Sequence, residues 1–291
     1  MNNTQRVVEL RGLVDQDDAS AWISNLWTKW NNQRQPKLQE WLEVDKYIFA
    51  TDTKTTSNSK LPWTHSTTTP KLTQIRDNLH SNYLSSLFPN DKWLTWNAYN
   101  DNSSSKEKSK TIRSYMENKI REGGYREAAS RMLYDYIDKG NAFAMPSFEA
   151  RYKVTDTDRV ADFIGPKAVR ISPLDIVFDP TAASFEKTPK IIRSIMSVGQ
   201  LKKLAEESPK DSGWVEAYVR RHALSEAAQT YPQDEWNKVS MYSVDGFGSL
   251  DEYYGSDTVE ILEFYGDFHD TYTGEMKSNQ MVTVIDRSIV A

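Results

Sequence analysis

Residues 71–99 read KLTQIRDNLHSNYLSSLFPNDKWLTWNAY, and the rest of the chain is organised around this stretch. Pro70 suits the first turn of a helix, and Pro89 ends that helix. Apolar residues recur at three- and four-residue steps, which predicts one apolar helical face made of Leu72, Ile75, Leu79, Tyr83 and Leu87. We expect this face to pack inside, with Arg76 facing elsewhere. The aromatic run 93–96 then predicts a short strand beside the helix.

The residues upstream of this stretch predict two helices rich in tryptophan. Asp17 or Asp18 caps the first helix, which carries Trp22, Trp27 and Trp30 and ends at a polar run of residues 31–33. Pro36 opens a second helix that reaches Ile48. The rings of these helices either form a core, which is their commoner role, or bind a neighbouring molecule. Residues 1–15 predict a loose arm, and residues 51–69 predict a loop anchored by Trp63.

The downstream half changes from a helical pattern to a β pattern at Asn141. After a polar linker, residues 106–122 and 125–139 predict helices that end at Gly123-Gly124 and Gly140. Beyond these, short β-prone segments predict an antiparallel meander with two further helices. The expected strands are 142–154, 160–171, 175–178, 191–198, 258–268 and 280–290, and the expected helices are 198–207 and 214–228. Gly274 suits the hairpin turn at 270–275.

These patterns define an α+β fold class with three regions. Residues 1–140 are mainly helical, residues 141–228 are mixed, and residues 229–291 are an acidic β region. With 291 residues, the chain is long enough for one large domain or two modest domains. Hydrophobic residues make up only 38%, yet there are nine Trp and fifteen Tyr. Such a composition fits either extensive burial against partners or an aromatic-rich core.

Several functional classes lack their sequence signals. The chain has no cysteine, which excludes disulfides and thiolate sites. It contains no phosphate-binding GxxxxGK[ST] loop, HExxH zinc motif, GxSxG elbow or EF-hand loop. A signal peptide and an apolar run of about 20 residues are also lacking, so we expect assembly in a cytoplasm without a membrane. The net charge of −5 argues against a protein that coats nucleic acid.

The ionisable residues predict no catalytic, cofactor-binding or metal site. The four histidines, His65, His80, His222 and His269, lie in four different elements, so a shared metal site is not expected. His80 stands out because it lies in the helix of residues 71–87, where a neighbouring hydrogen bond is the simplest role for it. The adjacent pairs Glu206-Glu207 and Asp251-Glu252 point in different directions and predict solvated surface. The chain is therefore not expected to be an enzyme.

Charge is segregated into two blocks. Residues 106–126 hold seven Lys and Arg against three Glu, a local net charge of +4. This basic block either meets DNA phosphates or an acidic neighbour, or forms a solvated helical face, which is the commoner outcome. Residues 239–276 hold nine Asp and Glu and no Lys or Arg. Such an acidic block repels nucleic acid and attracts basic partners.

Three segments of this chain resemble portal proteins, the head-tail connectors of short-tailed bacteriophages. They are NLHSNYLSSLFPNDKWLTW at 78–96, RISPLDIVFDP at 170–180 and the hydrophobic segment 191–198. The resemblance covers the order of elements from about Trp41 to Ala291 and corresponds to the N-terminal wing and the start of the clip of a portal. Because the β pattern runs to Ala291, we expect the stem, channel loop and crown of such a protein to lie beyond this sequence or to be absent.

The resemblance implies a structural virion protein that forms a ring, most often a homododecamer, at one vertex of the capsid. Its implied partners are copies of itself, the major capsid protein, the terminase, a tail adaptor protein and the double-stranded DNA that passes through the channel. On this view the acidic block lies at a DNA-passing or adaptor-binding end, and the basic block contacts an adjacent subunit. The alternatives are another phage neck, tail or internal ejection protein, or an enzyme acting on nucleic acid.

Overall fold

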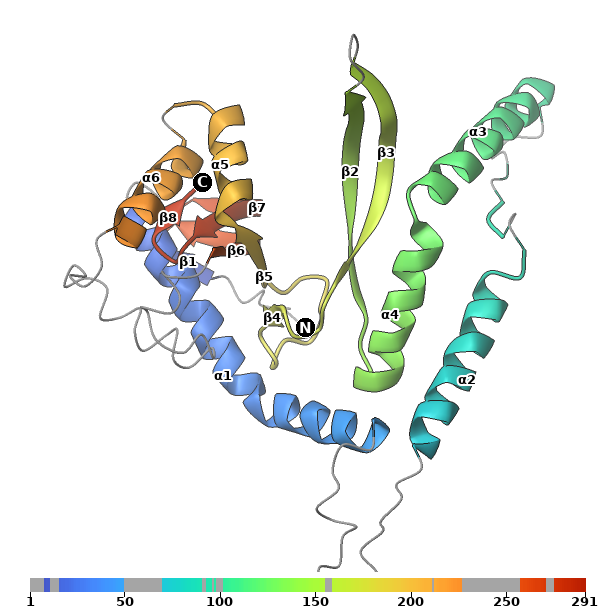
Figure 1. The fold of residues 1–291 in the computed structure, drawn as a ribbon, viewed down its shortest axis with the longest axis horizontal. Coiled ribbons are helices and arrows are strands. Elements are labelled where there is room, and N and C mark those ends of the chain that lie inside the picture. Colours follow the sequence, from blue (N-terminus) through green and yellow to red (C-terminus); the bar gives the residue numbers. More distant parts are fainter. Residues whose placement is uncertain are drawn as a thin grey trace, which may run out of the picture. The chain divides into compact units, whose positions relative to one another are not determined.

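The structure is a computed structural model that describes residues 8–10, 16–49, 70–90, 93–95, 97, 102–154, 159–210, 212–226, 257–270 and 275–291. The fold is α+β, as predicted, with a mainly helical part before Gly140 and, after it, mainly antiparallel strands with two further helices (Figure 1). Contacts group the chain into two compact units: unit 1 is residues 1–36 and 174–291, and unit 2 is residues 37–173. The division into regions 1–140, 141–228 and 229–291 stays a prediction about sequence character.

Unit 1 is built on a six-stranded sheet. Its strands run in the order β4-β5-β6-β7-β8, and β1 also pairs with β6 in parallel. The neighbours in the main path are all antiparallel. The strands are β1 (Val8–Leu10), β4 (Ile176–Phe178), β5 (Lys190–Ser197), β6 (Thr258–Asp270), β7 (Met276–Ile285) and β8 (Ile289–Val290). β1 is a correction, because residues 1–15 were expected to be only a loose arm.

Helices cover both faces of this sheet. Successive side chains of a strand point to opposite faces, so each strand can contribute to both clusters of buried residues. On one face, Leu262, Phe264 and Val284 pack against the N-terminal part of α1 (Gln16–Ile48), which contributes Ile23, Trp27 and Trp30. On the other face, Val259 and Ile285 pack against Leu201 of α5 (Val198–Glu207) and Ala217 of α6 (Gly213–Glu226). Ser197 caps α5 through a reciprocal capping box with Gln200.

Unit 2 contains three further helices and one long β-hairpin. The helices are α2 (Lys71–Leu87), α3 (Ser103–Glu122) and α4 (Tyr125–Lys139), and the hairpin pairs β2 (Phe143–Val154) with β3 (Arg159–Ile171). Gly124 and Gly140 have φ of 67° and 73°, a left-handed conformation that suits glycine, and they bound α4 as predicted. α4 contacts both α2 and β3 (Figure 1).

Two helix boundaries differ from the prediction. The two tryptophan-bearing helices are one helix, α1, which continues through Pro36. A proline inside a helix removes one backbone hydrogen bond and crowds the preceding turn, but it does not have to end the helix. Asn31 does not end it either, because its side chain is buried and accepts a hydrogen bond from Arg34 Nε at 3.0 Å. α3 begins at Ser103, so part of the predicted polar linker is helical.

The strand predictions also need three corrections. Trp93–Thr95 do not form a strand; instead the Trp93 ring packs against the rings of Phe88 and Tyr125. The expected single meander is divided, because β2 and β3 form a sheet of their own. The predicted strand 280–290 is β7 and β8, separated by a turn at residues 286–288. The loop at Trp63 lies outside the described residues, as do residues 271–274 of the hairpin turn.

Candidate subunit interface

The helix expected to pack through its apolar face packs through its polar face. Arg76 and His80 of α2 face α4, and the side chain of His80 is buried. The five apolar residues of α2 remain 41–54% exposed; they are Leu72, Ile75, Leu79, Tyr83 and Leu87, which we call the α2 stripe. This overturns the prediction about the inward face. A helical period shows that an apolar face exists, but it does not show which face the chain itself covers.

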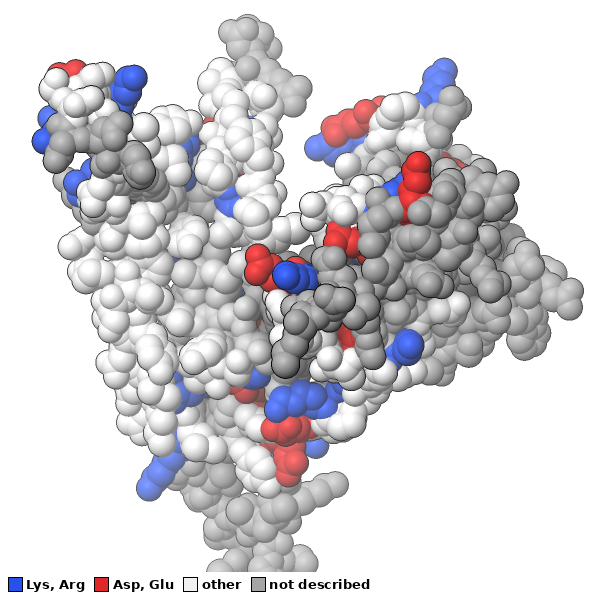
Figure 2. All heavy atoms as spheres, turned by 180° about the vertical axis from the view of Figure 1, so that it is seen from behind, with Lys and Arg blue, Asp and Glu red and all other residues white. Residues whose placement is uncertain are grey.

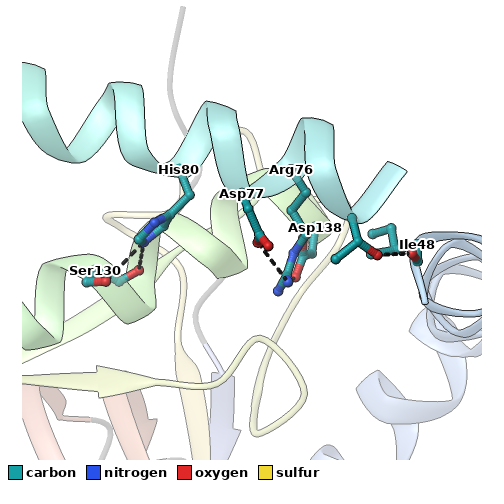
Figure 3. A network of polar contacts seen from close by, with 7 residues as sticks. Ile48, Arg76, Asp77, His80, Ser130 and Asp138 are labelled. Carbon is teal, nitrogen blue, oxygen red and sulfur yellow. Dashed lines mark hydrogen bonds and ion pairs between the residues drawn. The ribbon is translucent and has the colours of Figure 1, made fainter. Parts of the chain in front are cut away.

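A bidentate ion pair joins α2 to α4 (Figure 3). Nε and Nη2 of Arg76 donate to the two carboxylate oxygens of Asp138 at 2.6 and 2.7 Å. The hydrogen bond to Asp138 raises the pKa of Arg76, although partial burial opposes this effect. The guanidinium also lies 4.3 Å from the centre of the Tyr134 ring, within the range of a cation–π contact. Arg76 is therefore held in one position by α4.

His80 completes this polar contact. Its ring stacks on Tyr134 with a centroid distance of 3.8 Å and an interplanar angle of 7°. Its Nε2 atom lies 3.1 Å from the carbonyl oxygen of Ser130 and 3.0 Å from the Ser130 hydroxyl (Figure 3). Because a carbonyl oxygen only accepts, the first contact fits the tautomer with its proton on Nε2. His80 thus has the structural role expected from the sequence, a hydrogen bond to a neighbour.

A second ion pair, one turn earlier on α4, joins this helix to the hairpin. Arg170 of β3 binds both carboxylate oxygens of Asp135, and its Nη2 donates to one of them at 2.6 Å. The side chain of Asp135 is only 6% exposed. Charge-assisted bidentate pairs fix geometry as well as contributing energy. α4 is thus bound by two arginines, one from α2 and one from β3.

The hairpin has two different faces. On one face, Phe163 is buried and its ring lies 5.3 Å from Nζ of Lys119 of α3. Lys167 binds Glu149 across the strands at 2.9 Å, and Lys153 binds Asp162 at 2.7 Å nearer the tip. The hydrogen bonds from these lysines lower the pKa of both carboxylates. The even-numbered residues of β2 from Ala144 to Tyr152 are exposed.

The basic block lies on α3 and the start of α4. None of the described side chains of α3 is buried. Several of its charged side chains form ion pairs with other residues of the same helix. Arg113 binds Glu117 at 3.0 Å, and Lys119 binds Glu122 at 3.4 Å. These pairs reduce the charge that the block presents. Its solvated character fits the commoner of the two interpretations given above.

A cleft of about 270 Å³ lies at the corner between α3 and α4. Phe88, Trp93 and Ile120 give it an apolar lining, and Arg121 and Arg126 of the basic block also line it. Arg121 is already bonded to Asn118, through Nη2 at 3.0 Å. This cleft therefore offers apolar surface next to positive charge.

The acidic block is not uniformly a surface feature. Glu260 is 0% exposed on β6 and is bound by Arg287, which is also 0% exposed at the side chain. Nε and Nη2 of Arg287 donate to the two carboxylate oxygens at 2.6 and 3.1 Å. The pair stabilises the turn between β7 and β8, where Asp286 and Arg287 have φ of 50° and 55°. Glu260 is therefore removed from the set expected to face DNA or an adaptor.

The other described members of the acidic block are more accessible. Glu263 accepts a hydrogen bond from the Tyr265 hydroxyl at 2.8 Å, and burial together with this bond raises the pKa of Tyr265. Asp267 accepts a hydrogen bond from the backbone of Asn279 at 2.6 Å. Asp257 and Glu275 are exposed. Asp245, Asp251 and Glu252 lie outside the described residues, and the side chain of Asp270 is not described.

The remaining ionisable candidates do not converge on a site. Glu206 and Glu207 are exposed, as predicted. His222 packs near Tyr218 on α6, far in sequence from His80, while His65 and the side chain of His269 are not described. Across the described ranges, no group of three or more His, Asp or Glu is arranged to hold a metal ion. The helices in the described part of the chain include none that is long and apolar enough to span a membrane.

Comparison with known proteins identifies no relative: no family model matches this chain, and no curated protein matches it. The class is therefore defined by the fold and surface alone. It is an α+β protein in which polar pairs hold α2, α4 and the hairpin together, while large apolar side chains of the same elements are exposed. Sequence reasoning found the apolar residues of α2 but placed them inside.

Proposed function

We propose that this protein is a structural virion protein, a portal subunit that forms a ring at one vertex of a phage capsid. The proposal rests on the resemblance of segments 78–96, 170–180 and 191–198 to portal proteins. It is supported by the exposed apolar surface of unit 2, the observation that carries most weight. Exposed apolar patches of this kind mark surfaces that bind another macromolecule. In Figure 2, the surface over α2 carries few charged side chains.

In this role the subunit acts by position, and it makes or breaks no covalent bond. The ring, most often of twelve copies, gives double-stranded DNA its passage during packaging and ejection. The terminase supplies the energy for packaging and docks on the ring, and a tail adaptor docks there later. The major capsid protein surrounds the ring at its vertex. A closed ring requires a heterologous interface, in which one face of a subunit meets a different face of the next.

The test is the native mass of the purified protein, measured by mass photometry and accompanied by negative-stain images. We expect rings of about a dozen copies around a bore wide enough for duplex DNA, and antibody labelling of virions at a single vertex. A closed dimer, or a monomer at all concentrations, would contradict the proposal. A ring without a DNA-sized bore, or labelling along the tail, would instead identify another neck, tail or ejection protein.

A further inference from the structure

Apart from Arg170, which lies beside Ala144 and binds α4, one face of the hairpin carries no charge and is not covered by a described element. Seven residues of this face are exposed, and Phe148 is the most exposed large apolar side chain of the described residues, at 71%. Tyr152 and Ile164 are 42% and 36% exposed. The set, which we call the hairpin face, consists of Ala144, Pro146, Phe148, Ala150, Tyr152, Ile164 and Pro166. Native two-stranded ribbons of this kind are marginal in water unless something packs on them.

The α2 stripe is a second uncharged surface of the same unit. Thr73, Arg76, His80 and Leu84 form the inward side of α2, and the stripe lies about a quarter-turn away around the helix. From Asn78 to Leu87 the helix has no Asp, Glu, Lys or Arg. One residue of the stripe, Tyr83, makes an edge-to-face contact with Tyr136 of α4, with ring centroids 6.5 Å apart. The stripe is therefore available to a partner along most of its length.

These two surfaces lie on different sides of unit 2. α4 contacts both α2 and β3, so it separates the helix that carries the stripe from the hairpin (Figure 1). Most of the hairpin face points away from α3, because Phe163 and Gly165 on the opposite face lie beside Lys119 of α3. At the Ala144 end of the hairpin face, the neighbouring Arg170 binds Asp135 of α4. A unit with two separate apolar surfaces can bind one neighbour on each side.

The area of each surface fits a subunit interface. With about 200 Å² of accessible surface per large side chain, the stripe exposes roughly 500 Å² and the three large side chains of the hairpin face roughly 300 Å². The alanines and prolines of the hairpin face add to the second value. A stable interface buries about 800 Å² on each partner, of which about two-thirds is apolar in homo-oligomers. Each surface thus supplies most or all of the apolar area that one such interface needs.

We propose that the α2 stripe of one copy packs against the hairpin face of the next copy. A helix ridge of Leu, Ile and Tyr side chains fits a β-ribbon face that offers small residues beside Phe148. Burying these surfaces against each other desolvates no charge, which avoids the main cost of a polar contact. The contact is head-to-tail, so each copy retains one free stripe and one free hairpin face for further copies. This inference rests on the proposed ring function and assigns its interface.

The absence of cysteine from the chain allows a direct test by cross-linking. A Leu79→Cys, Phe148→Cys double variant is treated at low protein concentration with a short bifunctional thiol reagent. We expect a ladder of linked dimers, trimers and larger species on a denaturing gel. Each single variant alone gives no linked species, but a mixture of the two single variants gives dimers and nothing larger. That last result is the signature of a head-to-tail contact.

The matched control replaces Phe148→Cys with Val219→Cys. Val219 is a large apolar residue of α6, 61% exposed and outside both surfaces. A Leu79→Cys, Val219→Cys variant is expected to remain unlinked. Linked dimers from Leu79→Cys alone would overturn the inference, because they would show that two stripes pair with each other.

Charge variants separate failure of this inference from failure of the proposed function. Leu79→Glu and Phe148→Glu are each expected to reduce the native mass to that of a monomer, while circular dichroism stays unchanged because both side chains are exposed. If the wild-type chain forms rings and both variants still do so, the interface lies elsewhere and only this inference fails. If the wild-type chain never associates, the inference and the ring function both fail.

Discussion

The two units of this protein bury their apolar residues to different extents. In unit 1, Trp27, Phe264 and Leu262 are 0% exposed and lie between α1 and the sheet. In unit 2, the apolar residues of α2 are half-exposed, and the contacts of that helix are made by Arg76 and His80. Both clusters of buried apolar residues found in the described chain belong to unit 1.

This contrast shows which unit is complete as a single chain. Burial of apolar surface is the dominant favourable contribution to folding, and unit 1 obtains it from its own residues. Unit 2 buries single apolar side chains such as Phe88, Phe163 and Ile171, but neither cluster of buried apolar residues lies in it, and two bidentate ion pairs on α4 fix its geometry. An incomplete apolar burial is expected of a subunit whose remaining surface is covered by neighbouring subunits.

The largest effect should come from truncating an apolar side chain in unit 1. Phe264→Ala is expected to lower the free energy of unfolding of unit 1 by about 3–5 kcal/mol, because it removes a fully buried ring and leaves a cavity. The matched change in unit 2, Leu79→Ala, should alter the stability of the isolated chain by less than about 0.5 kcal/mol. Hydrogen exchange measured by mass spectrometry resolves the two units in one experiment.

The same pair of variants should show the opposite order in an association assay. Leu79→Ala is expected to weaken association of the chain with itself, because the stripe loses apolar area. A destabilisation of unit 2 by Leu79→Ala comparable to that of Phe264→Ala would break the contrast, because it would show that Leu79 belongs to a core within the chain.

Much of the fold could be predicted because local signals agree with the final structure. Pro70, Pro89, Gly124 and Gly140 bound helices as expected, and the α+β class follows from the change of pattern at Asn141. The helix boundary predicted at Pro36 was wrong because a proline within a helix costs only a limited free energy. The tertiary contacts of Trp27 and Trp30 outweigh that cost. The separate β2–β3 sheet could not be predicted, since strand pairing depends on long-range contacts that a single sequence does not display.

The candidate interface could be predicted only in part. The period of the α2 stripe is visible in the sequence, but the partner of that face is not. Arg76 and Asp138 are 62 residues apart, so no local sequence pattern predicts that they form an ion pair. Glu260 was misassigned for a related reason: its burial depends on Arg287, whose place is set by the turn between β7 and β8. Charge counts along the chain therefore cannot distinguish a surface carboxylate from a buried ion pair.

A smaller effect should follow from breaking the ion pair that joins α2 to α4. Arg76→Met is expected to lower the stability of unit 2 by about 2 kcal/mol, because it leaves Asp138, 11% exposed, without its charged partner. The matched control is Arg113→Met, which removes an i,i+4 pair on the surface of α3 and should cost about 0.3–0.5 kcal/mol. Urea unfolding and hydrogen exchange of peptides from α2 give both values.

The double variant Arg76→Met, Asp138→Asn sharpens this comparison. It should recover part of the loss, because the partly buried carboxylate is no longer charged. Equal losses in Arg76→Met and Arg113→Met would show that the α2–α4 contact depends on something other than this pair, and unit 2 would then resemble unit 1 more closely.

The smallest effect concerns the dependence of the hairpin on pH. Lys153 and Lys167 lower the pKa of Asp162 and Glu149 below their ordinary values near 4. A carboxylate whose pKa is lower in the folded state stabilises that state above its unfolded pKa, and the stabilisation is lost as the pH falls through the folded value. Protection of β2 and β3 against hydrogen exchange, corrected for intrinsic rates, should therefore decrease slightly between about pH 5 and about pH 3.

The double variant Asp162→Asn, Glu149→Gln should remove this decrease, because neither side chain then titrates. Both carboxylates lie at the surface, where solvent screens ion pairs, so the change in the wild-type hairpin is expected to be small. A large loss of protection below about pH 5 would show that these cross-strand pairs, rather than contact with α3 and α4, hold the hairpin together. The hairpin would then need no neighbouring copy to be stable. Unit 2 would then, like unit 1, be stabilised by its own residues.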